Sequence, residues 1–318
     1  GSKKCITCAN GTDAIQISLM ALGIGIGDEV IVPGFTYIAP AEAVVLLGAK
    51  PKYVDVCPET YNIDPEKLEL AITEKTKAII AVSLYGQCAD FEKINTIAKK
   101  HGLYVIEDAA QSFGAMQNEK KSCNLSTIAT TSFFPTKPLG CYGDGGAIFT
   151  NDLELAENIR QIARHGQEKR YYHVKIGINS RLDSIQAAIL IAKLTIFEEE
   201  IIKRDNIAKR YIDMFSNIGL KSIPVIKNYN KSVWAQFTIQ VNNREKIQNA
   251  LRERGIPTAI HYPIPLNMQP AVSDDRINLP VSIEAANHVL SIPMSPYLTE
   301  ENQEKIVLEI KKIYNNIP

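Results

Sequence analysis

The sequence has no net charge and no long apolar run. Its 35 basic and 35 acidic residues cancel, so it lacks the positive excess typical of proteins that bind nucleic acids or anionic membranes. Its longest apolar stretches, residues 78–82 and 187–192, are far too short to span a bilayer. No segment has the form of a secretory signal. We therefore expect a cytoplasmic protein whose partners include neither nucleic acid nor a membrane.

Cysteine is scarce, with six residues scattered through 318. This usage favours reduced thiols over a disulfide framework. The one close pair, Cys5 and Cys8, has no second pair at the spacing of a zinc ribbon. We therefore expect no metal site, and we interpret the pair as ordinary packing in a strand.

The glycine motifs that bind nucleotide cofactors are also missing. The glycines of residues 23–27 follow a predicted helix instead of a strand, so they lack the context of a dinucleotide-binding turn. The glycine cluster of residues 143–146 follows a lysine, whereas in a Walker motif the glycines come first. Neither a dinucleotide nor a nucleoside triphosphate is expected as the cofactor.

The first half of the chain alternates short β-branched runs with longer helical patterns. This alternation predicts an α/β fold with a mainly parallel central sheet. The length favours two domains, because single cores stop growing near this size. We predict a large domain over residues 1–200 and a smaller α+β domain over residues 201–318. Strands are predicted at residues 5–8, 29–33, 51–56, 78–83 and 104–108, and helices at 14–22, 41–47, 65–72 and 90–101.

The second half begins with a long helical pattern over residues 183–203, which would link the two domains. A second helix is predicted to run to about residue 218. Residues 261–266 are too rich in proline for regular structure and predict an ordered loop. The other predicted elements are a strand at residues 234–241, a helix at 244–254 and a final helix after residue 299.

Lys137 lies among aromatic, small and backbone-restricting residues. A partly apolar setting of this kind lowers the pKa of an amine and suits it to form a Schiff base. Taken alone, such a lysine is more often one whose charged tip reaches solvent.

Asp108 ends a predicted strand, so its carboxylate would stand at the carboxyl edge of the sheet, where ligands bind in such folds. A lone aspartate there is more often a cap or turn residue. Together, however, Lys137 and Asp108 supply two groups that pyridoxal 5'-phosphate (PLP) requires: an amine for its aldehyde and a carboxylate for its ring nitrogen.

A phosphate would need donors of its own. Gly11 and Thr12 precede a predicted helix, and backbone amides and the dipole at a helix N-terminus favour an anion. Ser132 lies five residues before Lys137 and offers a second hydroxyl. The alternative for the first segment is a plain helix start capped by Thr12 or Asp13.

With these residues the sequence resembles the DegT-type nucleotide-sugar aminotransferases, which have the aspartate aminotransferase fold (PLP fold type I). The resemblance covers essentially the whole chain. It implies that PLP is the cofactor, that the chain is a transaminase, and that the fold is a large PLP-binding domain followed by a smaller C-terminal one. Its markers are residues 10–14, 27–31, 33–37, 107–111, 132–146 and 177–183.

The resemblance also assigns roles to single residues. Lys137 would hold the cofactor and move a proton, Asp108 would pair with the ring nitrogen, and Gln111 would contact the ring hydroxyl. Tyr37 would stack on the ring, where the alternative is a tyrosine of the core at a strand end. The phosphate would be bound by Gly11, Thr12 and Ser132, and by Asn179 of a neighbouring subunit. A homodimer with a shared active site is therefore implied.

Within the family, four local segments resemble the members that aminate UDP-2-acetamido-2-deoxy-3-oxo-glucuronate, an O-antigen precursor. They are residues 83–90, 121–126, 140–144 and 261–266. Such a substrate carries a carboxylate and a diphosphate and calls for cationic donors. Arg181, His261 and Tyr262 are the candidates, and glutamate is the expected amino donor. Arg181 could equally be a structural ion-pair partner.

Other functions stay open at this point. One is amination at C4 of a 6-deoxy sugar, and another is a PLP-binding regulator without turnover. The regulator is disfavoured because no DNA-binding module is visible, and a dehydratase because those members replace the lysine by histidine. Family members also carry helices before the first strand, near the dimer interface and the active site, whereas this sequence begins close to that strand.

Overall fold

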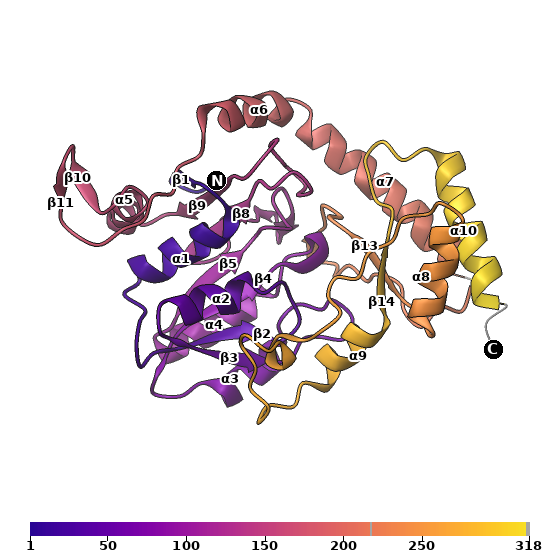
Figure 1. Ribbon diagram of the computed structural model, residues 1–318, viewed down its shortest axis with the longest axis horizontal. Helices are drawn as coiled ribbons and strands as arrows, with labels where there is room; N and C mark the ends of the chain where they lie inside the picture. The colour runs from indigo at the N-terminus through magenta and orange to yellow at the C-terminus, as the bar shows by residue number, and fades with distance from the viewer. Residues whose placement is uncertain (217, 316–318) are drawn as a thin grey trace.

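The centre of the molecule is a seven-stranded sheet (Figure 1). The computed structural model describes residues 1–216 and 218–315. Strand β9 runs antiparallel to both of its neighbours, and every other neighbouring pair is parallel. This arrangement confirms the prediction of a mainly parallel sheet. In spatial order the strands are β1 (Lys4–Cys8), β9 (Gly146–Thr150), β8 (Ile128–Ser132), β5 (Tyr104–Asp108), β4 (Thr76–Val82), β2 (Glu29–Pro33) and β3 (Lys50–Val54).

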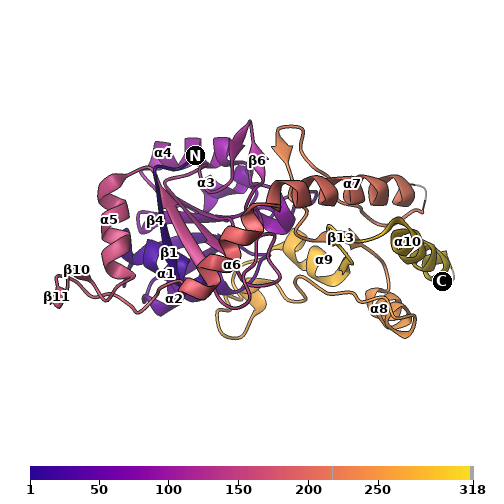
Figure 2. The same cartoon turned by 90° about the horizontal axis from the view of Figure 1, so that it is seen from above.

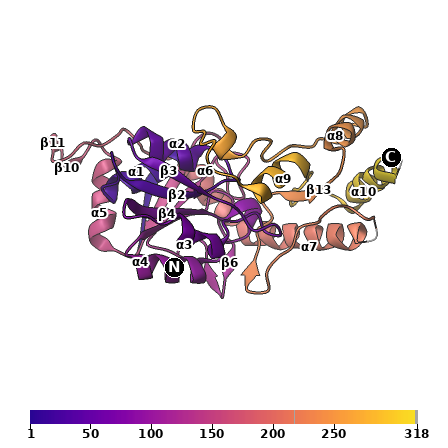
Figure 3. The same ribbon diagram turned by 90° about the horizontal axis from the view of Figure 1, so that it is seen from below.

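Helices cover both faces of this sheet because alternate strand residues point to opposite sides. Val30 and Val32 pack with residues of α1 (Gly11–Ala21), α2 (Ala39–Leu46) and α5 (Leu153–Ile162). Ile31, between those two valines, packs with residues of α3 (Leu68–Ala71) and α4 (Phe91–His101). Figures 2 and 3 show α1 and α2 on one side of the sheet and α3 and α4 on the other.

Two predicted helices have different bounds in the structure. Helix α1 begins at Gly11, three residues before the predicted start, because the Asn10 side chain caps it by accepting the Asp13 N–H at 2.8 Å. The single helix predicted over residues 183–203 is instead two, α6 (Ser184–Leu194) and α7 (Phe197–Phe215). The break falls at Thr195, whose hydroxyl donates to the Ala192 carbonyl at 2.7 Å and competes with the helical pattern.

The C-terminal part has a core of its own. Helices α7, α8 (Arg244–Glu253) and α10 (Glu300–Asn315) enclose the antiparallel pair β13 (Phe237–Gln240) and β14 (Val289–Ile292). The strand predicted at residues 234–241 is thus shorter than expected, and residues 261–266 do form an irregular ordered segment up to Leu266. Residues 217 and 316–318, within the predicted second helix and at the end of the predicted small domain, lie outside the described residues.

Helix α9 (Pro280–His288) departs from this C-terminal core. Its Ala285 and Ala286 pack with Phe35 and Val56 of the first half. The division at residue 200 therefore stays a proposal, because α9 follows that boundary in sequence but packs against the first half. The remaining short elements are η1 (Pro65–Lys67), η2 (Leu84–Gly86), β6 (Met116–Gln117), β7 (Lys120–Lys121), β10 (Gln167–Lys169), β11 (Tyr172–His173), β12 (Asn230–Lys231) and η3 (Leu266–Met268).

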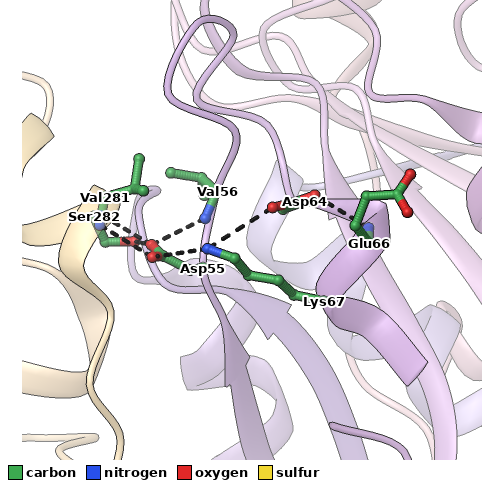
Figure 4. Close-up of polar contacts among 7 residues, drawn as sticks. All are labelled: Asp55, Val56, Asp64, Glu66, Lys67, Val281 and Ser282. Carbon is green, nitrogen blue, oxygen red and sulfur yellow. Dashed lines mark hydrogen bonds and ion pairs between the residues drawn. The ribbon is translucent and has the colours of Figure 1, made fainter. Parts of the chain in front are cut away.

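A buried carboxylate attaches α9 to the sheet (Figure 4). Asp55 is 3% exposed and accepts the backbone N–H groups of Val281 and Ser282 at 3.0 and 2.8 Å. It thereby caps a helix more than 200 residues away in sequence. Lys67 lies 3.3 Å from the same carboxylate. Burial alone would raise the pKa of Asp55, but hydrogen bonds from Ser282, Val281 and Val56 outweigh it and hold that pKa below its ordinary value.

No helix among the described residues is long and apolar enough to cross a membrane.

Candidate active site

The predicted site residues meet at the carboxyl edge of the central sheet. Asp108 is the last residue of β5 and Ser132 the last of β8, and these strands are parallel neighbours. Lys137 lies in the turn that follows β8, where its backbone N–H donates to the Phe134 carbonyl at 2.9 Å. The sheet topology therefore places the amine and the carboxylate on the same edge, as the sequence predicts.

Lys137 and Asp108 influence each other's ionisation. Burial lowers the pKa of the Lys137 ammonium, and the negative charge of Asp108 opposes that shift only in part. Asp108 is 6% exposed. Burial raises the pKa of its carboxyl, while the Ala110 N–H, which donates to it at 3.0 Å, and the Lys137 charge act in the other direction. A lysine with a lowered pKa has more of the neutral amine needed for attack on an aldehyde.

Three backbone elements form a cradle at the N-terminus of α1. Gly11 is its first residue, and a Cβ built there would lie 2.7 Å from the Ser132 Cβ. A Cβ on Gly146, the first residue of β9, would lie 2.5 Å from both the carbonyl carbon and the oxygen of Asn10. Only glycine fits at these contacts. The N–H groups of the first helical turn, including those of Gly11 and Thr12, have no partner within a helix and can bind a phosphate.

Gln111 joins this edge to the C-terminal half. It is buried, and its amide nitrogen donates to the Tyr262 hydroxyl at 3.3 Å. The Tyr262 ring centroid lies 5.9 Å from that of Tyr37, which is 56% exposed in the loop after β2. Burial raises the pKa of Tyr262, with the nearby Asp108 charge acting in the same direction. The structure thus places Tyr37 and Gln111 around Tyr262, which lies near Asp108.

His261 lies next to this group. Its Nδ1 is 2.9 Å from the Ser291 hydroxyl of β14, which in turn lies 2.9 Å from the Thr238 hydroxyl. Burial lowers the pKa of His261, and the positive charge of Lys137 lowers it further. The imidazole is therefore largely neutral at pH 7, and it lies close enough to Lys137 for that charge to affect its pKa.

Two predicted residues are not brought to the site within one subunit. Asn179 and Arg181 are both exposed. Arg181 forms no ion pair with a described residue of its own subunit. Between them, Ser180 is buried and accepts the Ala9 N–H at 2.9 Å. The segment therefore lies beside the N-terminus of α1 while the two polar side chains on either side of Ser180 face outward.

Some residues of the site were missed by the sequence analysis. Tyr85, which donates its backbone N–H to Gln111 at 2.8 Å, was noted only within a segment of family resemblance. Glu107 is fully buried and accepts the Ser122 hydroxyl at 2.6 Å. Burial raises its pKa to about 7, partly offset by hydrogen bonds from Ser122, Cys123 and Leu125. The available signal for Glu107 was an acidic residue that still belongs to the strand, directly after its apolar residues Val105 and Ile106. No local signal marked Tyr85.

The residues present fit PLP. A partly desolvated lysine faces a buried carboxylate, and a glycine-lined cradle at a helix N-terminus stands where a phosphate would be held. The Tyr262 ring lies near the carboxylate, and it contacts both the Gln111 amide and the Tyr37 ring. These are the groups that would hold the aldehyde, the ring nitrogen, the phosphate and the ring face of this cofactor.

Comparison with known proteins agrees with this geometry. A profile of the DegT/DnrJ/EryC1/StrS aminotransferase family matches residues 1–311. The chain is 64% identical over 298 residues to the UDP-2-acetamido-2-deoxy-3-oxo-D-glucuronate aminotransferase of Pseudomonas aeruginosa PAO1, a match that covers 94% of this chain and 83% of that protein.

Comparison with solved structures also finds aminotransferases of this family. A DegT DnrJ EryC1 StrS aminotransferase from Brucella abortus superposes with a TM-score of 0.96 at 45% identity, covering 99% of this chain and 87% of that one. NtdA from Bacillus subtilis, solved with bound cofactor PMP, superposes with a TM-score of 0.92 at 36% identity, covering 99% of this chain and 74% of that one. The predictions of PLP fold type I, of the cofactor and of transaminase activity are confirmed. The chain is a PLP-dependent aminotransferase and belongs to the DegT/DnrJ/EryC1/StrS aminotransferase family.

Proposed function

We propose that this chain transfers an amino group from glutamate to C3 of UDP-2-acetamido-2-deoxy-3-oxo-D-glucuronate. The observation that carries the proposal is the 64% identity, over 94% of the chain, to a protein named for that substrate. The product would be an amino sugar for O-antigen in lipopolysaccharide or another surface polysaccharide. Nucleotide sugars are made in the cytoplasm, and the six free cysteines suit that reducing compartment.

The catalytic work falls to Lys137 and Asp108. Bound PLP supplies an electron sink for the carbanion that forms when the substrate carbon loses its proton. Lys137, with its lowered pKa, would hold the cofactor aldehyde and, once its amine is free, would carry a proton between two carbons. Asp108 would keep the ring nitrogen protonated, and its burial would strengthen the attraction between the two opposite charges. Gln111 and Tyr37 would orient the ring.

Substrate recognition falls to His261, Tyr262 and Arg181. A uronate and a diphosphate need directed hydrogen-bond donors, and a cation such as Arg181 adds charge attraction. His261 and Tyr262 stand beside Lys137 and Gln111, where the reacting sugar would lie. Arg181 is exposed and unpaired among the described residues, so its guanidinium is available to an anionic ligand at a subunit boundary.

The active site is proposed to be shared between two copies of the chain. Helix α6 buries only Leu190, whereas Ile185 and Ile191 are 74% and 68% exposed. The hairpin of β10 and β11 projects from the body of the molecule, and Ile176 beside it is 85% exposed (Figure 1). Apolar surface of this extent favours a protein partner. Asn179 lies between the hairpin and α6, which suits it to reach the phosphate in a second subunit.

The test of function combines the purified enzyme, PLP, glutamate and the 3-oxo sugar nucleotide, with mass spectrometry of the product. We expect a mass consistent with replacement of the carbonyl oxygen by an amino group, and a visible cofactor band that disappears when glutamate is added. Lys137→Ala should lower turnover at least about 100-fold. A 4-oxo-6-deoxy sugar nucleotide serves as the competing substrate. Faster amination of that sugar, or full turnover by the lysine variant, would contradict the proposal.

The shared site is tested by mixing two inactive variants. Lys137→Ala and Asn179→Ala subunits carrying different tags are expressed together, and dimers containing both are isolated. If Asn179 serves the partner's site, one site of each mixed dimer has both residues intact, and activity returns. Mixed dimers that stay as inactive as either parent would show that the two residues serve the same subunit's site.

A further inference from the structure

Tyr85 occupies an unusual turn at the carboxyl end of β4. Its φ is 57°, in the left-handed region that non-glycine residues seldom adopt, and Gly86 follows with φ 105°. A Cβ on Gly86 would lie 2.7 Å from the Trp234 backbone nitrogen, so the turn is pressed against the C-terminal half. Backbone conformations of this kind persist where surrounding contacts hold them, and they cluster at functional sites.

The contacts that hold Tyr85 form a closed ring of four residues. Its backbone N–H donates to the Gln111 side-chain oxygen at 2.8 Å. The Gln111 amide nitrogen donates to the Tyr262 hydroxyl at 3.3 Å. Tyr262 follows His261 in the chain, and the Tyr85 hydroxyl donates to the His261 carbonyl. The ring therefore links the turn after β4, the cofactor edge and the loop of residues 261–266.

The Tyr85 side chain is suited to fix that loop. Its ring lies in the buried cluster that includes Phe35 and Val56, with the Tyr61 ring 5.6 Å away in an edge-on orientation. Burial raises the pKa of the Tyr85 hydroxyl well above its ordinary value, so the group stays protonated and serves as a donor. Because packing already restricts the Tyr85 ring, the hydrogen bond from its hydroxyl to the His261 carbonyl costs little further conformational entropy.

We propose that Tyr85 is a positioning residue for the substrate side of the site, holding His261 and Tyr262 against Gln111. The proposal rests on the function proposed above, since it assumes that His261 and Tyr262 contact the sugar nucleotide. Because the backbone N–H of residue 85, and not its hydroxyl, contacts Gln111, the hydroxyl affects the loop without touching the cofactor edge. Removing the Tyr85 hydroxyl should therefore weaken sugar binding and leave cofactor binding unchanged.

The test is Tyr85→Phe, which keeps the ring and removes the hydroxyl. Tyr61→Phe is the matched control, because its hydroxyl accepts from Gln240 at 3.0 Å and does not reach the loop. On the enzyme loaded with pyridoxamine phosphate, which does not react with an amine, calorimetric titration with the UDP-linked 3-amino uronate should show roughly 5- to 10-fold weaker binding for Tyr85→Phe and unchanged binding for Tyr61→Phe. The PLP form of each variant is used for the absorbance spectrum. Amide hydrogen exchange in peptides covering residues 259–264 should accelerate in Tyr85→Phe alone. The visible cofactor band should stay unchanged.

Two results would overturn the proposal. In one, Tyr85→Phe matches wild type in both sugar binding and hydrogen exchange. In the other, cofactor retention and sugar binding fall together, which indicates general damage to the buried cluster. If the wild-type enzyme itself binds no UDP-sugar, the proposed function fails, while the hydrogen exchange of residues 259–264 still decides the role of Tyr85.

Discussion

The two sides of the site differ in how their residues are held. On the cofactor side, Asp108, Ser132 and Gly11 stand at the ends of regular elements, and Lys137 follows one of them closely. On the substrate side, His261 and Tyr262 lie in an irregular loop held by Tyr85, Ser291 and Gln111 from distant parts of the chain. The cofactor side is therefore fixed by the sheet, and the substrate side by side-chain contacts between two halves.

This difference suits an enzyme family whose members share one cofactor but act on different sugars. Residues at strand ends are placed precisely by a rigid scaffold, whereas loops change without disturbing the sheet. If the two sides are independent, a substitution on one should leave the function of the other intact.

The largest expected effect is on the cofactor side. Asp108→Asn keeps the size of the side chain but removes the charge proposed to hold the ring nitrogen protonated, so turnover should fall roughly 100- to 10,000-fold. Steady-state kinetics measure the loss, and calorimetry should find sugar binding little changed. Asp152→Asn, in the exposed cap of α5, is the control and should retain full turnover. Turnover near wild type in Asp108→Asn would remove this carboxylate from the mechanism.

Glu107 offers a test on the same side through pH. Because burial raises its pKa from 4.5 to about 7, the folded protein binds the proton more tightly than the unfolded chain does. Stability from this group is thus fully present below pH 4.5 and declines as pH rises towards 7. Glu107→Gln mimics the neutral form and does not titrate. The free energy of unfolding of this variant, relative to that of the wild type, should therefore rise by up to about 3 kcal/mol as pH increases from 4.5 to 7. Urea unfolding at several pH values measures this, and a constant difference would contradict it.

Gly146→Ala tests the close approach that forms the cradle. The added Cβ would lie 2.5 Å from the backbone of Asn10, so α1 must shift and unfolding should become easier by roughly 3 kcal/mol. Cofactor affinity should fall with it. Gly25→Ala is the matched control, because its Cβ would meet only the Leu47 oxygen at 3.9 Å. Equal effects of the two substitutions on urea unfolding and cofactor binding would refute the cradle.

The smallest effect is expected where α9 attaches to the sheet. Asp55→Asn replaces one acceptor oxygen by a donor facing backbone N–H groups, which should cost about 2 kcal/mol of unfolding free energy near pH 7. Because the pKa of Asp55 is lowered, its contribution exists above the ordinary aspartate pKa and disappears as pH falls through the folded value, so the two proteins should converge in acid. Asp64→Asn is the control, because Asp64 caps the local turn η1 and lies 3.8 Å from Lys67 but makes no hydrogen bond to α9. The visible cofactor band should survive in Asp55→Asn.

Much of the cofactor side could be predicted from sequence. Strands β2 and β5 have the predicted bounds, because apolar runs ended by polar or proline residues mark strands. Once the sheet was expected to be parallel, Asp108 and Lys137 had to share an edge. The start of α1 was misplaced because Gly11 and Thr12 read as loop residues, whereas Asn10 caps the helix ahead of them.

The substrate side could be named only through family resemblance. Nothing local indicates that Tyr85 reaches His261, which is 176 residues away, or that Asp55 caps α9. The break between α6 and α7 was also missed, because a single hydroxyl interrupts an otherwise continuous helical pattern.

The sequence by itself determined the fold class and the cofactor and named Lys137 as the residue proposed to hold that cofactor, because these depend on periodic patterns and on residue types with a specific chemistry. The tertiary structure alone decided how His261 and Tyr262 are held beside Lys137, how α9 is attached to the sheet, and that Asn179 and Arg181 face outward. These features depend on contacts between residues far apart in sequence, and such contacts leave no periodic signal in the chain.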